Sequence, residues 1–269
     1  MTESPPFFLL IGGSDSSSGA GIQRDSMTIR QLGGYPLTVL TAVTAQNHEE
    51  CSYVEFLSRK IVTQQILSLL ALYPIKAVKI GVLGSDVTIR HLAPFLTPLA
   101  KARIPIILDP VISASTGYCF QNDKAQHALM TTFFPILHCI TPNIYEAQCL
   151  TRSTIANTHD AIESASILRA QGVKNVIITG GDGNNHRGTG NDIEDVLLCE
   201  GRDEPIISRH ARMRSTPFYH HGTGCCFASA LSFFVANGHD MLSSYQRARD
   251  VVIAHLRKTD TDTGIGGLA

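Results

Sequence analysis

The stretch HHGTGCC, residues 220–226, places two histidines and two cysteines around a Gly-Thr-Gly turn. A zinc site would need all four side chains to converge, but adjacent residues point in different directions on strands and on helices. The stretch also lacks the usual spacings of zinc ligands. Residues 227–238 have helical periodicity, so the glycines lie at a predicted helix N-terminus, where N–H groups and the helix dipole favour an anion. We therefore interpret Gly222–Gly224 as an anion-binding turn, and we expect its field to lower the pKa of the Cys225 thiol.

TPNIYEA, residues 141–147, is a second candidate, because Asn143 and Glu146 share one face of a predicted helix start. One interpretation is an N-cap followed by an acidic residue in the first turn. The other is a site for a hard cation, because amide and carboxylate oxygens suit Mg²⁺. Asp109, in LDPV, is a strand-end carboxylate that would join such a site and would otherwise be a turn or cap residue. The sequence leaves both interpretations open.

The Gly/Ser-rich stretch GGSDSSSGAGIQRD, residues 12–25, connects a predicted strand to a predicted helix. Its glycines permit close backbone approach to a ligand, and the helix start offers N–H groups. It contains neither G-x-G-x-x-G nor G-x-x-x-x-G-K-[ST], so Rossmann and Walker-type phosphate loops are excluded. On its own, the stretch is equally compatible with a tight turn.

Short apolar runs alternate along the chain with segments of helical period, which predicts an α/β fold with a mostly parallel sheet covered by helices on both faces. The predicted strands are 7–13, 36–47, 51–57, 75–84, 104–111, 135–143 and 173–181, and the predicted helices are 21–33, 59–73, 86–100, 122–134, 144–150 and 158–171. Ligands bind at the carboxyl ends of strands in such sheets. Polar residues at those ends should therefore share one rim: Asp15, Gln46, Asn47, Lys79, Asp109, Asn143 and Thr179, with Gly180 and Gly181.

Residues 180–201 are expected to form a loop and a hairpin that project from the main sheet. We find no internal repeat and no linker, so we expect a single domain over residues 1–269.

Composition excludes several classes of protein. The formal net charge of -1 gives no electrostatic case for nucleic acid or a membrane surface, and no apolar run is long enough to span a bilayer. The seven cysteines are scattered without C-x-x-C spacing, which argues against disulfides and zinc ribbons and favours a reducing cytoplasm. The N-terminus lacks the basic region of a signal peptide.

Taken in order, GGSDSSSGAGIQRD, TAVTAQN, KIGVL, LDPV, TPNIYEA, GG and HGTGC resemble the hydroxymethylpyrimidine/phosphomethylpyrimidine kinases of thiamine synthesis. These belong to the ribokinase-like superfamily, and the match runs over about residues 7 to 256. The resemblance implies an ATP- and Mg²⁺-dependent kinase, often a homodimer. Its substrates would be 4-amino-5-hydroxymethyl-2-methylpyrimidine, through the hydroxymethyl group, and in a second step the monophosphate.

The resemblance also implies roles for individual residues. Cys225 would be the catalytic base, beside an anion hole formed by Gly222, Thr223 and Gly224. The pyrimidine would be bound by Asp25 and Gln46, with Gly13 and Val82 beside it. ATP would be bound by Asp109, Asn143, Glu146, Thr179 and Gly181, with Mg²⁺ at Asp109 and Glu146.

The sequence departs from the family pattern at three of these positions. Ser18 stands for a glycine and Val82 for a methionine, and Thr179 stands for a lysine that helps the family to hold phosphate. The resemblance therefore leaves the second phosphorylation open. Two alternatives remain: a pyridoxal kinase, because the two ring substrates are alike, and a non-catalytic nucleotide-binding relative, for which Thr179 argues.

Overall fold

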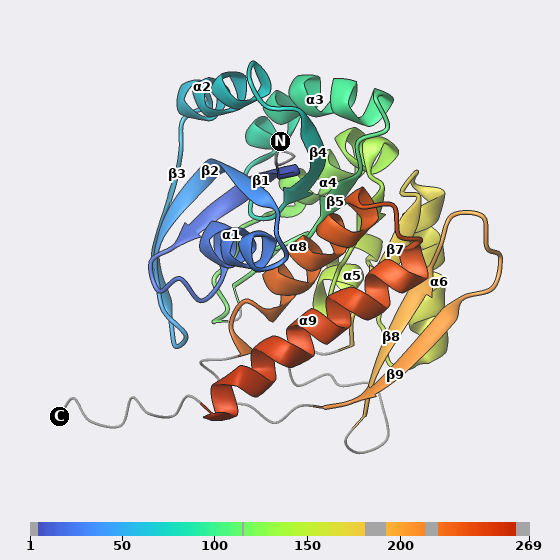
Figure 1. Ribbon diagram of the computed structural model, residues 1–269. Coiled ribbons are helices and arrows are strands. Elements are labelled where there is room, and N and C mark those ends of the chain that lie inside the picture. The colour runs from blue at the N-terminus through green and yellow to red at the C-terminus, as the bar shows by residue number, and fades with distance from the viewer. Residues whose placement is uncertain (1–4, 115, 181–191, 213–219, 262–269) are drawn as a thin grey trace.

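A single nine-stranded sheet runs through the protein in the order β3-β2-β1-β4-β5-β6-β7-β8-β9 (Figure 1). The computed structural model describes residues 5–114, 116–180, 192–212 and 220–261. The strands are β1 (Phe7–Asp15), β2 (Tyr35–Gln46), β3 (Cys51–Phe56), β4 (Ile75–Ile80), β5 (Ile106–Leu108), β6 (Cys139–Ile140), β7 (Asn175–Ile178), β8 (Asp192–Leu198) and β9 (Ile206–Ala211). The run from β2 to β7 is parallel, while β3, β8 and β9 pair antiparallel at the two edges. This confirms the predicted architecture.

Two helix layers cover the sheet, and the alternation of side chains along each strand explains them. Leu9 and Ile11 of β1 pack into a core with one set of helices, which comprises α2 (Arg59–Leu70), α3 (Asp86–Lys101), α4 (Asp123–Thr132), α5 (Ile144–Thr151) and α6 (Thr158–Ala170). Phe8 and Leu10 point to the other face, because successive strand residues alternate, and they pack with α1 (Gly21–Gln31) and α8 (Thr223–Ala236). The helix α9 (Met241–Thr261) lies against α8 on that same side (Figure 1).

Some elements differ from their predicted bounds. The strands β5 and β6 are much shorter than the apolar runs 104–111 and 135–143, because residues 134–136 form a 3₁₀ turn and only the buried centres of the runs pair with neighbours. The predicted hairpin is present in part, because β8 pairs antiparallel with β7 and with β9, but it extends the main sheet and does not project from it. Among the described residues, no helix has the length and apolar character needed to cross a membrane.

Candidate active site

The polar strand-end residues lie along one edge of the sheet. Asp15 and Gln46 end β1 and β2, and Asp109 follows β5, where its backbone N–H donates to the Ile80 carbonyl at 2.8 Å. Asn143 and Thr179 follow β6 and β7 and pair with each other in an isolated parallel bridge. Because the parallel strands all end at this edge, residues from five separate segments come together here.

The predicted anion-binding turn lies at the start of α8. Gly222 is the N-cap, with φ of 84°, and no described side chain caps the helix. The first N–H groups of a helix have no acceptor within it, so these amides are available to an external anion. A Cβ at Gly222 would collide with the carbonyl oxygen of Gly19, so both the left-handed conformation and the close approach require glycine here. The Thr223 hydroxyl donates to the His220 carbonyl at 3.0 Å.

Cys225 lies in the first turn of α8 and is half-buried. Burial raises the pKa of its thiol above the ordinary value, and the nearby Lys79 ammonium and the Gly21 backbone N–H oppose that rise only in part. The expectation that this pKa is lowered is therefore wrong. The helix field is present, but desolvation and the carboxylates of Asp25 and Asp109 outweigh it.

Beneath Cys225 lies a buried ion cluster that the sequence did not reveal. The Lys79 ammonium lies 2.9 Å and 3.0 Å from the two Asp25 oxygens and 3.3 Å from Asp109 Oδ2. Burial by itself would lower the pKa of Lys79, but these neighbouring charges outweigh it and raise the pKa, so the side chain stays charged. A Cβ at Gly81 would lie 3.2 Å from Lys79 Nζ, so this glycine makes room for the ammonium.

Asp25, expected to contact the pyrimidine, lies in this buried ion cluster. Its side chain is 1% exposed, and its Oδ1 also accepts a hydrogen bond from the Ser229 hydroxyl of α8 at 2.8 Å. With both oxygens held by Lys79 and Ser229, the carboxylate joins α1, β4 and α8. These contacts support the helix that carries the anion-binding turn, and the expected contact between Asp25 and the pyrimidine stays a prediction.

Asp109 lies between this cluster and the turn. Its Oδ1 is 4.0 Å from the position of a Cβ at Gly224. Its Oδ2 faces the ion cluster, 3.3 Å from the Lys79 ammonium. Carboxylate oxygens suit hard cations, so Oδ1, the oxygen nearer the turn, is the donor that a cation beside the turn would contact.

Asn143 and Glu146 form a reciprocal capping box at the start of α5. The Asn143 side chain accepts from the Glu146 N–H at 2.9 Å, and the Glu146 carboxylate accepts from the Asn143 N–H at 2.9 Å. The capping interpretation thus describes their geometry, and a further contact to a cation or phosphate stays a prediction.

The residues expected around a ring substrate lie at the ends of β1, β2 and β4. A Cβ at Gly13 would lie 3.6 Å from the Val82 Cβ, so the two positions are neighbours. The Gln46 amide nitrogen lies 3.3 Å from His221 Nε2. Thr179 is half-buried beside Asn143, and Gly181 lies outside the described residues.

His221 and Asp15 are site residues to which the sequence reasoning gave no role. His221 Nε2 lies 2.8 Å from Asp15 Oδ2, and both side chains are buried. Burial raises the pKa of Asp15, but hydrogen bonds from His221, Ser17 and Ala20 outweigh it and lower this pKa to about 2. This pair joins the loop after β1 to the anion-binding turn. The sequence signal was a histidine directly before the turn and an aspartate at a strand end.

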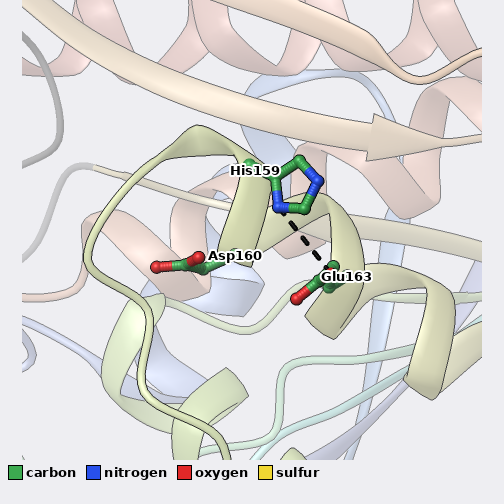
Figure 2. Close-up of side chains that lie close together, drawn as sticks. All are labelled: His159, Asp160 and Glu163. Carbon is green, nitrogen blue, oxygen red and sulfur yellow. Dashed lines mark ion pairs between the residues drawn. The ribbon is translucent and has the colours of Figure 1, made fainter.

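A separate cluster of His159, Asp160 and Glu163 lies in the first two turns of α6 (Figure 2). Asp160 Oδ2 accepts the N–H groups of Ala156 and Asn157 at 2.8 Å and 3.2 Å. His159 and Glu163 are exposed and 3.8 Å apart, one helical turn from each other. Capping of α6 explains this arrangement, and we assign it no metal.

Comparison with known proteins gives a consistent picture. The family described as phosphomethylpyrimidine kinase matches residues 15–268. A hydroxymethylpyrimidine/phosphomethylpyrimidine kinase of Haemophilus influenzae is 35% identical over 91% of this chain and 89% of its own length. A thiamine biosynthesis bifunctional protein of Geobacter sulfurreducens is 34% identical over 93% of this chain, which spans 49% of that longer protein.

Solved structures agree with the sequence comparisons. The phosphomethylpyrimidine kinase of Clostridium difficile superposes with a TM-score of 0.76 and 30% identity, covering 93% of this chain and 98% of the other. A pyridoxal kinase of Staphylococcus aureus in complex with pyridoxal gives a TM-score of 0.81 and 25% identity, covering 95% and 89% of the two chains.

Proposed function

The chain belongs to the phosphomethylpyrimidine kinase family, and from this membership we propose that it transfers the γ-phosphoryl group of ATP to 4-amino-5-hydroxymethyl-2-methylpyrimidine in thiamine biosynthesis. The observation that carries the proposal is the convergence at one edge of the sheet. The uncapped N–H groups of α8 lie beside Cys225 and the Oδ1 of Asp109.

ATP as phosphoryl donor is supported by the pyridoxal kinase of Staphylococcus aureus, which has been solved with AMP-PCP. We place the nucleotide at the ends of β6 and β7, near Asn143 and Thr179, so that its terminal phosphoryl reaches the turn at Gly222–Gly224. Phosphoryl transfer passes through a loose transition state, so positioning and charge stabilisation provide most of the catalysis. The N–H groups of the turn, fixed in advance, would supply that stabilisation.

In this proposal Cys225 accepts the proton of the substrate hydroxyl as the oxygen attacks. Because burial raises the pKa of this thiol, the ionised fraction is small near neutral pH. A late proton transfer in a loose transition state requires only a weak driving force, so the small fraction suffices, and the rate should increase as the pH rises.

Mg²⁺, when bound, would neutralise charge on the phosphate oxygens. The Oδ1 of Asp109, which lies near the turn, fits such a cation, whereas Glu146 already accepts from the Asn143 N–H and would contribute through water. The second phosphorylation and a homodimer stay further proposals that rest on the family resemblance. A cytoplasmic location and a single domain over residues 1–269 stay proposals that rest on the cysteine pattern and on the lack of a linker in the sequence.

A pyridoxal kinase activity is the second candidate, favoured by the likeness to the Staphylococcus aureus enzyme. The test offers purified protein with ATP and Mg²⁺ three acceptors in parallel: the hydroxymethylpyrimidine, its monophosphate and pyridoxal. We expect ADP and the phosphorylated pyrimidine to form together. Turnover of pyridoxal without turnover of either pyrimidine would replace the proposal, and turnover of no acceptor would favour a non-catalytic relative.

A further inference from the structure

A second buried ion cluster lies behind the end of β7 and has no part in the proposed chemistry. Asp195 of β8 is 0% exposed. Its Oδ1 accepts the backbone N–H of Gly180 at 2.9 Å, and its Oδ2 accepts the Tyr245 hydroxyl at 2.7 Å. The Arg249 guanidinium of α9 forms an ion pair with the same Oδ2. The carboxylate thus joins a strand end to α9.

Arg249 also contacts the helix that carries the anion-binding turn. Its guanidinium lies 4.8 Å from the centre of the Phe227 ring and 5.9 Å from that of Tyr245. Phe227 belongs to α8 and is two residues beyond Cys225. A single buried cation therefore contacts α8 directly and the end of β7 through Asp195.

The end of β7 has little freedom apart from this contact. A Cβ at Gly180 would collide with the Glu194 carbonyl oxygen of β8. Only glycine therefore lets the backbone after β7 approach the backbone of β8 this closely. The preceding residue, Thr179, pairs with Asn143 and donates its N–H to the Pro142 carbonyl at 2.9 Å. The direction of the Gly180 amide is thus set by Asp195 on one side and by β6 on the other.

We propose that Arg249, acting through Asp195, is a positioning residue that holds the Thr179–Gly180 end of β7 in register with the turn at the start of α8. The inference rests on the proposed function, which places the nucleotide between these two segments. A buried carboxylate that loses its cationic partner is strongly destabilised, so Asp195 without Arg249 would rotate or admit water and release the Gly180 amide. His210 Nε2, 3.9 Å from Asp195 Oδ2, is too far away to replace the guanidinium.

The experiment measures the KM for ATP, the KM for the pyrimidine and the dissociation constant of ADP in Arg249→Met and Asp195→Asn. The second variant keeps the side-chain shape and guards against simple failure to fold. We expect both variants to weaken ADP binding and raise the KM for ATP roughly tenfold, with the pyrimidine KM nearly unchanged. Arg249→Lys, which keeps the charge, should recover part of the loss. The control is Arg257→Met, an exposed arginine on the same helix, which should match wild type.

Hydrogen exchange at the Gly180 amide gives a readout that needs no turnover, and we expect faster exchange in both variants. An equal change in the two KM values, or unchanged exchange at Gly180 with only a lower melting temperature, would overturn the inference. Failure of the proposed function would look different. Wild type would then bind ADP without phosphorylating the pyrimidine, while Gly180 would still exchange faster in the variants than in wild type.

Discussion

Cys225 combines two opposing influences in one side chain. The helix start, the Gly21 N–H and Lys79 favour its thiolate, whereas burial and two carboxylates favour the thiol and win. Only a small fraction of Cys225 is therefore present as thiolate, the form that acts as nucleophile or base. That balance protects a half-buried cysteine from adventitious alkylation and oxidation, since the thiolate is the reactive form.

Replacing Cys225 tests this role directly. Cys225→Ala should lower kcat by about a hundredfold, the usual contribution of a general base, and leave ADP binding nearly intact. Because the pKa of the thiol is raised, wild-type kcat should rise with pH through the neutral range, and the alanine variant should lose this rise. Phosphate transfer at equal rates and with equal pH profiles in the two proteins would remove Cys225 from the mechanism.

Lys79 should matter first for stability. Lys79→Met leaves the Asp25 carboxylate buried beside an apolar side chain, which should lower the free energy of unfolding by about 3–5 kcal/mol. Lys79→Met combined with Asp25→Asn removes both charges and should recover part of the loss. Lys76→Met, on the exposed side of the same strand, should stay within about 0.5 kcal/mol of wild type. Urea unfolding of wild type and the three variants measures these free energies. Equal losses for Lys79→Met and Lys76→Met would contradict the assigned charge pair.

At the scale of elements, the turn at the start of α8 depends on backbone geometry that only glycine provides. Gly222→Ala combines a positive φ with a collision at Gly19, whereas Gly238→Ala at the other end of the helix has the same φ of 84° and nothing within 4 Å. The αL strain alone costs about 1–2 kcal/mol, so both variants should lose stability. Only Gly222→Ala should also lose kcat. If Gly238→Ala impairs kcat equally, the turn has no special role.

The contact between Asp15 and His221 joins the loop after β1 to this turn. The stability that this contact contributes should depend on pH. The folded-state pKa of Asp15 is depressed from 3.8 to about 2, so its contribution is complete above pH 3.8 and is lost as the pH falls through about 2. Wild type should exceed Asp15→Asn in unfolding free energy by about 2 kcal/mol at neutral pH, and the difference should shrink over that acidic window. Denaturant unfolding at several pH values measures it, and a difference that is constant through the window would contradict the assignment.

The sequence predicted the helices and strands well, because the spacing of apolar residues within each element is visible locally. It also predicted that polar strand-end residues lie along one edge of the sheet, because parallel strands all end at that edge. It could not pair residues across the chain. Asp15 and His221 are 206 residues apart, and Ser229 is 204 residues from Asp25. The pKa of Cys225 was predicted in the wrong direction for the same reason, since it is raised first by burial in the folded chain and then by carboxylates from α1 and from the end of β5.

At the scale of the whole molecule, two buried charge clusters flank the anion-binding helix. One, at Lys79, joins α8 to α1 and the centre of the sheet. The other, at Arg249, joins α8 to α9 and the β7 end of the sheet. A nucleotide bound between the end of β7 and the turn would therefore engage segments that both clusters hold, and its binding energy should appear as stability of the whole fold.

ADP should raise the unfolding free energy by about 2.7 kcal/mol when free ADP is about a hundredfold above its dissociation constant. At fixed ADP the increase should be larger with Mg²⁺ than with EDTA, because the proposed cation would join the nucleotide phosphates to Asp109, whose Oδ1 lies near Gly224. Asp109→Asn should remove this Mg²⁺-dependent part, whereas Asp203→Asn, at an exposed turn, should retain it. Thermal unfolding with ADP, with and without Mg²⁺, measures both effects. If Asp109→Asn keeps the full Mg²⁺ dependence, the cation binds elsewhere, and Asp109 serves only to hold Lys79 beneath the turn.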